Sequence, residues 1–228
     1  MITVKKNTVP FFSIIITTFN RAKQTENALN SLLSNSERDW EAIVVDDGSI
    51  DNTFNIVKDK IKKDDRIRYI FQNNQGPALA KNTGILASSG SIITFLDSDD
   101  EYRKDHLAVR KEIFYFDDTI DMVHGGVDVI GYPYVPDENN RSDLIHINDC
   151  IIGGTFFIKT EKIIELNGFP AVDFGEDIHL YEKAKSKNFK IAKTNASTYI
   201  YNRKNSESIC NRIRKHAERK SEKEKRAF

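Results

Sequence analysis

The sequence predicts an α/β fold in which a mostly parallel, Rossmann-like central sheet is flanked by helices. In its first hundred residues, short β-branched runs alternate with longer segments of helical periodicity, which is typical of a parallel sheet covered by helices. The β-branched runs are almost continuously apolar, as expected for strands buried on both faces. After residue 101 the strands become short and irregular, which indicates a smaller mixed part. We expect one domain over residues 1–210, a size that permits a substantial core.

The first half supplies the elements of the parallel sheet. Four apolar runs are expected to be its strands: Phe12–Thr17, Glu41–Asp46, Ile67–Phe71 and Ser91–Leu96. Between them, three segments carry apolar residues at helical spacing and are expected to be helices: Arg21–Leu33, Thr53–Lys63 and Gly76–Ser88. Pro77 suits the first turn of the third helix.

The second half is expected to complete the fold around a mixed sheet. Helices are predicted at Asp105–Phe116, Thr160–Leu166 and Gly175–Lys187. Strands are predicted at Met122–His124, Val127–Ile130, Thr155–Ile158, Phe189–Ala192 and Thr198–Tyr201. A Gly/Pro/Asn-rich loop at Gly131–Asp143 is a candidate flap over an acceptor.

Charge and cysteine content limit the partners and the compartment. The 34 basic and 34 acidic residues balance, so net charge provides no argument for a nucleic-acid partner. Two cysteines without metal-ligand spacing, and an N-terminus without the apolar stretch of a signal peptide, predict a cytoplasmic protein. Segment 211–228 is basic, with a net charge near +5. It is either a solvated helix or a peripheral contact with anionic lipid headgroups at the inner face of a membrane.

Polar residues follow three of the predicted strands, where ligands of open α/β sheets bind. These clusters are Thr17-Thr18-Phe19-Asn20-Arg21, Asp46-Asp47-Gly48-Ser49 and Asp97-Ser98-Asp99-Asp100. Capping of the following helices is an alternative role, for Asn20 and Asp51 above all. The third cluster exceeds what capping needs, because three carboxylates within four positions repel one another unless a cation is present. Oxygen ligands suit Mg²⁺ or Mn²⁺.

These segments, in this order, resemble the nucleotide-sugar-binding half of the family 2 glycosyltransferases, which have the GT-A fold. The segments are FSIIITTFNRA, EAIVVDDGSIDNT, NNQGPALAKNTGILASSGSIITFLDSDD, GGTFFIKTEKIIELNGFP and GEDIHLYEKA. The resemblance covers roughly residues 11–203. It implies an inverting transferase that moves one sugar from a nucleotide-diphosphate donor, most simply a UDP-sugar, to a glycan or lipid-linked acceptor. It places the nucleotide-sugar-binding half at about residues 11–100 and the acceptor-side half at about 101–203.

The resemblance also implies roles for single residues. Thr17 and Phe19 would contact the uridine, Asp47 would hydrogen-bond the uracil, and Asn20 and Ser98 belong to the same donor-binding segments. Asp99 would ligate the divalent cation, Asp97 would bind the ribose or the cation, and Lys81 would lie near the nucleotide or its diphosphate. Asp177, in the pair Glu176-Asp177, would be the general base that accepts the proton of the acceptor hydroxyl.

Several of these positions also have plainer interpretations. Glu176 and Asp177 could simply be first-turn acids favoured by the helix dipole. His179 could face the site or the surface, and Gly153 and Gly154 could admit an acceptor or form an ordinary turn. His124 and Cys150 are expected to be structural.

Other functional classes are less well supported by the sequence. The glycine-rich turn of a nicotinamide-dependent dehydrogenase and the phosphate-binding GxxxxGK[ST] loop are absent, and TTFNRA replaces the basic glycine-rich loop of nucleotidyltransferases. A Gln-x-x-Arg-Trp motif, which marks many processive synthases of the family, is also absent. The rival from another class is a noncatalytic nucleotide-sugar- or glycan-binding module with the same fold.

Overall fold

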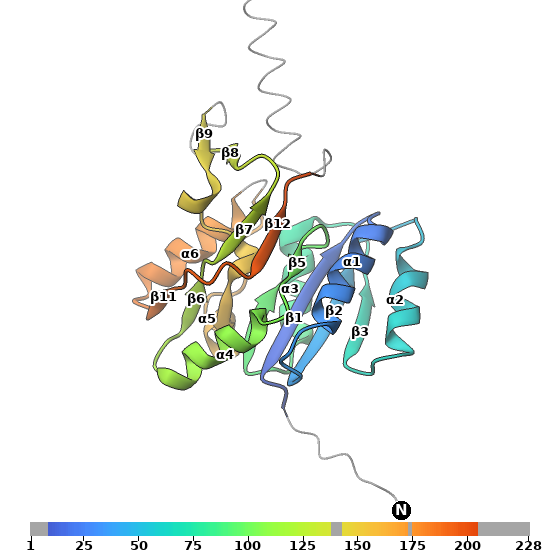
Figure 1. The fold of residues 1–228 in the computed structure, drawn as a ribbon, viewed down its shortest axis with the longest axis horizontal. Coiled ribbons are helices and arrows are strands. Elements are labelled where there is room, and N and C mark those ends of the chain that lie inside the picture. Colours follow the sequence, from blue (N-terminus) through green and yellow to red (C-terminus); the bar gives the residue numbers. More distant parts are fainter. Residues whose placement is uncertain (1–8, 138–142, 173–174, 205–228) are drawn as a thin grey trace, which may run out of the picture.

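The computed structural model describes residues 9–137, 143–172 and 175–204, and three sheets organise them (Figure 1). The large sheet has the strand order β11-β6-β10-β4-β1-β2-β3, a smaller sheet has the order β5-β12-β7, and β8 pairs with β9. The strands are β1 (Phe12–Thr18), β2 (Trp40–Asp46), β3 (Ile67–Phe71), β4 (Ile92–Phe95), β5 (Glu101–Tyr102), β6 (Met122–His124), β7 (Val127–Ile130), β8 (Tyr134–Pro136), β9 (Leu144–His146), β10 (Phe157–Lys159), β11 (Ile191–Lys193) and β12 (Tyr199–Asn202).

Helices cover both faces of the large sheet, as the sequence predicted. The helices are α1 (Ala22–Leu33), α2 (Thr53–Ile61), α3 (Pro77–Ala87), α4 (His106–Phe116), α5 (Thr160–Glu165) and α6 (Glu176–Ser186), with short 3₁₀ helices η1 (Ile147–Asp149) and η2 (Gly153–Thr155). Side chains of β1 alternate between the two faces: Ile14 belongs to the buried cluster that includes residues of α1, α2 and α4, whereas Ile15 belongs to the cluster that includes residues of α3, α5 and α6. Among the described residues, none of the helices is both long and apolar enough to cross a membrane.

The four strands of the first half form one parallel block, β3-β2-β1-β4. Ile15 of β1 lies between Ile43 of β2 and Phe95 of β4, and all three are buried. Strand β10 then joins antiparallel to β4, which makes the other half of the sheet mixed. The predicted α/β class, with a mostly parallel sheet and a smaller mixed part, is therefore confirmed.

The second half differs from the prediction at several elements. Thr155 belongs to η2 rather than to a strand, and β10 begins two residues later, at Phe157. The strand predicted at Phe189–Ala192 is β11, which begins two residues later and spans Ile191–Lys193. Part of the loop predicted at Gly131–Asp143 is β8, which pairs with β9, and the two-residue strand β5 was not predicted. The basic segment 211–228 and Cys210 lie outside the described residues, so membrane contact through that segment stays a prediction.

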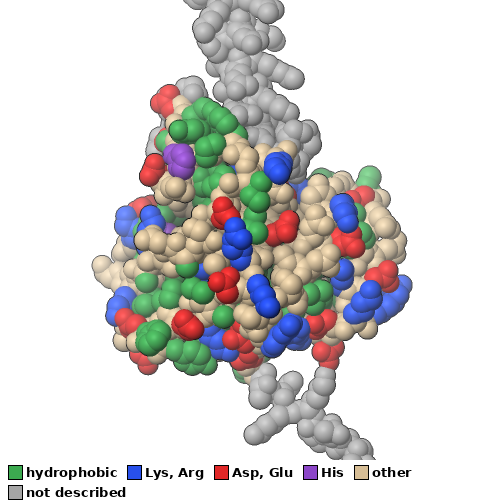
Figure 2. Space-filling view, in the orientation of Figure 1, with side chains coloured by type: hydrophobic (Ala, Val, Ile, Leu, Met, Phe, Trp, Pro, Cys, Tyr) green, Lys and Arg blue, Asp and Glu red, His purple; other side chains and the backbone are tan. Residues whose placement is uncertain are grey.

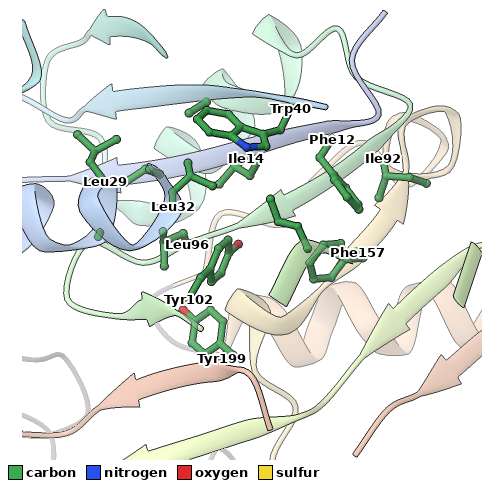
Figure 3. Close-up of a cluster of buried hydrophobic side chains, with 14 of the residues drawn as sticks. Phe12, Ile14, Leu29, Leu32, Trp40, Ile92, Leu96, Tyr102, Phe157 and Tyr199 are labelled. Atoms are coloured by element: carbon green, nitrogen blue, oxygen red, sulfur yellow. The ribbon is translucent and has the colours of Figure 1, made fainter. Parts of the chain in front are cut away.

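One hydrophobic cluster connects the large sheet to the small one. Phe12, Trp40 and Phe157 extend from the large sheet, and Tyr102 and Tyr199 close the cluster from β5 and β12 (Figure 3). The small sheet is thus fixed to the large one by buried aromatic packing.

On the face seen in Figure 2, Lys and Arg side chains are interspersed with Asp and Glu side chains rather than gathered by sign.

Truncation of Phe157 should cost a large part of the stability. Its ring is fully buried and packs edge-on against Phe12, with 5.5 Å between ring centroids. We expect Phe157→Ala to lower the free energy of unfolding by about 3–5 kcal/mol, measured by urea denaturation. The matched control is Phe116→Ala, because Phe116 is 89% exposed and its loss should change stability by about 0.5 kcal/mol or less. Equal destabilisation by the two variants would contradict this description of the core.

Candidate active site

The carboxyl ends of β1, β2 and β4 lie at one edge of the sheet, as predicted. Thr18 is in register with Asp46, and the Asp47 amide donates to the Thr18 carbonyl at 2.8 Å. The amide of Leu96 donates to the carbonyl of Ile15 at 3.0 Å, which places the turn after β4 beside the end of β1. The three polar clusters therefore share one rim of the molecule.

Asp47 lies at the β2 end of this rim. Its carboxylate is buried and accepts hydrogen bonds from the amides of Gln75 (2.9 Å) and Gly76 (2.8 Å) and from the side chain of Gln72 (2.7 Å). Asp47 therefore holds the loop that leads into α3, and a contact with a base would use the acceptor capacity that these three bonds leave. The Phe19 side chain is 46% exposed near the end of β1.

Asn20 and Asp51 join the loops after β1 and β2, and Asn20 does not cap α1 as the capping alternative expected. Asn20 has a left-handed φ of 51°, and its side-chain oxygen accepts from the Ile50 amide at 2.8 Å. Asp51 accepts instead from the amide of Ala22, the first residue of α1, and from the amide of Thr53, the first of α2. Asp51 thus satisfies backbone donors at the start of both helices.

The turn after β4 presents two carboxylates, each beside a basic side chain. Arg21 contacts Asp99 at 3.0 Å, and Lys81 lies 3.9 Å from Asp97. Ser98 is buried beneath the turn, where its hydroxyl lies 3.4 Å from Arg21. Arg21 was not predicted as a site residue, although it belongs to the TTFNRA segment. The sequence shows no spacing that would pair it with Asp99, 78 positions away.

Asp100, the last residue of this turn, is buried and is held by Tyr199 of β12. The Tyr199 hydroxyl donates to the Asp100 carboxyl group at 2.7 Å, and the Asn202 amide donates to it at 2.8 Å. Burial and the nearby Asp99 and Asp97 charges raise the pKa of Asp100 well above its ordinary value. A Cβ on Gly154 would meet the Tyr199 hydroxyl at 2.1 Å, so glycine is needed here for close packing.

Lys81 connects the carboxylates of the turn after β4 to the pair at the start of α6. It is 5% exposed, and its Nζ lies 3.0 Å from Glu176 and 3.9 Å from Asp97. Burial alone would lower the pKa of Lys81, but Asp97, Glu176 and Asp177 raise it above its ordinary value. Lys81 is therefore a cation held between the two halves of the site.

Glu176 and Asp177 lie side by side but in different electrostatic states. Burial opposes ionisation of Glu176, yet the contact with Lys81 holds its pKa below the ordinary value. Burial and the charge of Glu176 raise the pKa of Asp177 to about 6, although Lys81 and the Gly153 amide oppose the shift. Asp177 accepts a hydrogen bond from Gly153 at 2.9 Å. A carboxylate with such a pKa is suited to accept a proton near neutral pH.

Of the other predicted positions, Gly153 contacts the Glu176-Asp177 pair, whereas the His179 side chain is exposed. A Cβ on Gly153 would lie 3.0 Å from the Cβ of Asp177, so Gly153 forms the wall against the carboxylate. His179 is exposed on α6. The structure thus brings Lys81, Asp97, Glu176 and Asp177 together, with Asp99 on the same turn as Asp97.

The turn after β4 carries the type of ligand that hard divalent cations prefer. Asp97 and Asp99 supply only oxygen ligands, and their side chains remain 32% and 14% exposed. No group of three or more His, Cys, Asp and Glu residues that could hold a metal occurs within residues 9–137, 143–172 and 175–204. A cation at this turn would therefore need further ligands from outside the described residues.

Acidic and basic side chains at the carboxyl edge of a parallel sheet thus face a carboxylate pair at the start of α6. The model of the family "Glycosyl transferase family 2" matches residues 13–172. The chain belongs to this family of glycosyltransferases. The resemblance inferred from the sequence is therefore confirmed.

Curated relatives and solved structures agree with this assignment. A glycosyltransferase of Rickettsia felis is 30% identical over 189 residues, covering 77% of this chain and 30% of its own length. A Campylobacter jejuni GalNAc(5)-diNAcBac-PP-undecaprenol beta-1,3-glucosyltransferase is 44% identical over 95 residues, covering 41% of this chain and 31% of its own. The chain spans about a third of the length of such relatives.

The similarity in fold extends over most of the chain. Residues 1–349 of Staphylococcus aureus TarS, in complex with UDP-GlcNAc, superpose with a TM-score of 0.72 at 24% identity, covering 86% of this chain and 59% of that one. A mannosyltransferase from Pyrobaculum calidifontis, in complex with GDP-Man and Mn²⁺, gives a TM-score of 0.67 at 20% identity, covering 85% of this chain and 57% of that one. These structures show that the GT-A fold expected from the sequence is present.

Proposed function

We propose that this chain is an inverting, metal-assisted glycosyltransferase that moves one sugar from a UDP-sugar to a hydroxyl of a glycan or lipid-linked acceptor. The observation that carries the proposal is the position of Asp177, whose carboxylate lies across Lys81 from the Asp97–Asp99 turn. The nucleotide-sugar-binding half would comprise about residues 11–100, and the acceptor-side half about residues 101–203. TarS and the C. jejuni glucosyltransferase support the classes of donor and acceptor.

Donor binding would use the rim of the parallel strands. Thr17 and Phe19 lie at and after the end of β1 for contact with the uridine, and Asp47 fixes the loop beside them. Arg21 and Lys81 supply positive charge beside the carboxylates where the diphosphate would lie. Asp99, with Asp97, would hold Mg²⁺ or Mn²⁺, which when bound neutralises charge on the departing diphosphate. The Mn²⁺ of the Pyrobaculum enzyme supports this choice of cation.

Asp177 would take the proton of the acceptor hydroxyl as its oxygen attacks the anomeric carbon. The new carbon–oxygen bond forms opposite the bond to the diphosphate, which breaks, so the anomeric configuration inverts. Glu176 is ionised and engaged by Lys81, and the Gly153 amide orients the Asp177 carboxylate. Because Lys81 stabilises the ionised form of Glu176, Glu176 is the weaker base, and Asp177 is the group that would bind the proton.

The pH dependence of the reaction tests this assignment. A base with a pKa of about 6 is deprotonated above that pH, so kcat/KM should rise up to about pH 6 and level off above it. Below pH 6, kcat/KM should fall about tenfold for each pH unit. The measurement is nucleotide release with saturating metal, and the control is donor affinity by calorimetry over the same range. A profile that is flat between pH 5 and 7, with unchanged donor affinity, would exclude Asp177 as the base.

A further inference from the structure

A cavity of about 280 Å³ lies in the acceptor-side half, outside the rim where the donor would bind. Its wall combines the end of β6 and the β6–β7 connection with η1, the segment leading into η2, and the residues after β11. The residues that matter for its chemistry are His124, Asn195, Ser197, Ile147, Ile152 and Cys150. The donor-binding and proton-transfer roles proposed above use none of these side chains.

His124 is the residue that points to a ligand. The residue is 6% exposed, and neither ring nitrogen forms a hydrogen bond within the described part of the chain, although neither is fully buried. An imidazole on a cavity wall whose nitrogens are accessible and without a protein partner can bind a polar group inside the cavity. Burial and the charge of Lys193 lower the pKa of His124, which keeps the ring neutral, with one donor and one acceptor nitrogen.

The cavity adjoins the proposed base. Ile152 and Thr155 line it, and between them Gly153 donates its amide hydrogen to Asp177 at 2.9 Å. The His124 ring also packs edge-on against Tyr181, with 5.0 Å between the ring centroids. Tyr181 lies four residues after Asp177 on α6, hence on the same side of the helix. Two separate elements therefore connect the cavity wall to the Asp177 carboxylate.

The composition of the wall selects the class of ligand. Neutral hydrogen-bonding groups of His124, Asn195 and Ser197 are combined with the aliphatic side chains of Ile147 and Ile152. Among the described residues that line it, Lys193 is the charged one. This mixture suits a ring with hydroxyls at its edge and C–H groups on its face, and the volume lies just below the range of about 300–1,000 Å³ for sites of drug-sized ligands, as a single ring requires.

We propose that this cavity is a subsite for one sugar ring of the saccharide acceptor, recognised by His124. The proposal rests on the transferase function proposed above and identifies where the acceptor is held. His124 and Cys150, which the sequence suggested to be structural, would then be a specificity residue and a reporter of occupancy.

Protection of Cys150 from alkylation tests the subsite without knowledge of the natural acceptor. In a Cys210→Ser background, Cys150 is the single cysteine, and its alkylation by iodoacetamide can be followed by intact mass. The probes are methyl glycosides of glucose, galactose, mannose and N-acetylglucosamine, with mannitol as an acyclic polyol control. We expect at least one glycoside to slow alkylation about threefold relative to mannitol when present at about twice its Kd.

Two variants at His124 make the test specific. His124→Phe keeps a ring against Tyr181 but removes the nitrogens, so protection should be lost while the rate without sugar stays the same. His124→Gln keeps a donor and an acceptor and should retain protection. Three results would overturn the proposal. They are no protection in the chain that keeps His124, full protection in His124→Phe, and loss of protection in both variants.

Donor binding and donor hydrolysis on the same samples separate this proposal from the proposed function. Failed protection in a protein that still binds and hydrolyses a UDP-sugar removes the subsite alone. A protein that neither binds nor hydrolyses any UDP-sugar contradicts the transferase function itself.

Discussion

Asp177→Asn should reduce the rate of sugar transfer by about 10²- to 10⁴-fold, the contribution expected of a general base. The asparagine amide keeps the size of the side chain and can still accept the Gly153 hydrogen bond, but it cannot bind the proton of the acceptor hydroxyl. Affinity for the UDP-sugar should remain within about twofold, because the lost interaction belongs to the transition state. Stopped-time assays of transfer or hydrolysis, with calorimetry for donor binding, measure the two quantities.

Glu182→Gln is the matched control for this variant. Glu182 lies on the same helix and is an exposed carboxylate paired with Lys185 at 3.0 Å. Its replacement should leave transfer unchanged, since surface pairs contribute little to stability. Transfer by Asp177→Asn at the normal rate, with a folded protein, would mean that another group accepts the proton.

Asp99→Ala should remove most of the metal-dependent part of donor binding. The carboxylate supplies hard oxygen ligands, so its loss should weaken donor affinity in the presence of Mn²⁺ by about tenfold or more. The variant also leaves Arg21 without this contact, which stands at 3.0 Å. Calorimetric titration of the UDP-sugar, with Mn²⁺ and with a chelator, measures the effect.

Asp59→Ala provides the control for loss of a carboxylate as such. Asp59 is 65% exposed on α2 and pairs with Lys62 at 2.9 Å, away from the β4 turn. The donor affinity of Asp59→Ala should match that of the unsubstituted chain, both with Mn²⁺ and with a chelator. If the unsubstituted chain bound the donor tightly and equally well with Mn²⁺ and with a chelator, donor binding would not be metal-assisted.

The parallel half of the fold could be predicted because its strands are buried on both faces. Runs such as that around Ile15 are almost continuously apolar, and such runs between helical segments have few other interpretations. The hairpin of β8 and β9 could not be predicted in this way. Each strand has only three residues, which is too short for an alternating pattern to be recognised, and Tyr134 and Leu144 remain 40% and 41% exposed. Such short strands are formed by pairing, which the sequence does not display.

The site could be predicted as far as the strand-end rule extends. That rule placed Thr17, Asp47, Asp97 and Asp99 at one rim, while the resemblance supplied Asp177. The contacts between side chains could not be predicted, because Lys81 meets Glu176 across 95 positions of sequence. Nor does a local pattern show that Asp47 binds the loop before α3 or that Tyr199 supports Asp100. Such interactions depend on tertiary packing, which periodicity does not report.

The anomeric configuration of the first product tests the central claim most directly. A UDP-sugar with an α linkage can be hydrolysed by the protein with water as the acceptor, and ¹H NMR identifies the sugar released before it mutarotates. A single displacement assisted by Asp177 predicts that the initial product is the β anomer, and that its formation is lost in Asp177→Asn. An initial α anomer would contradict the inverting mechanism and the role assigned to Asp177.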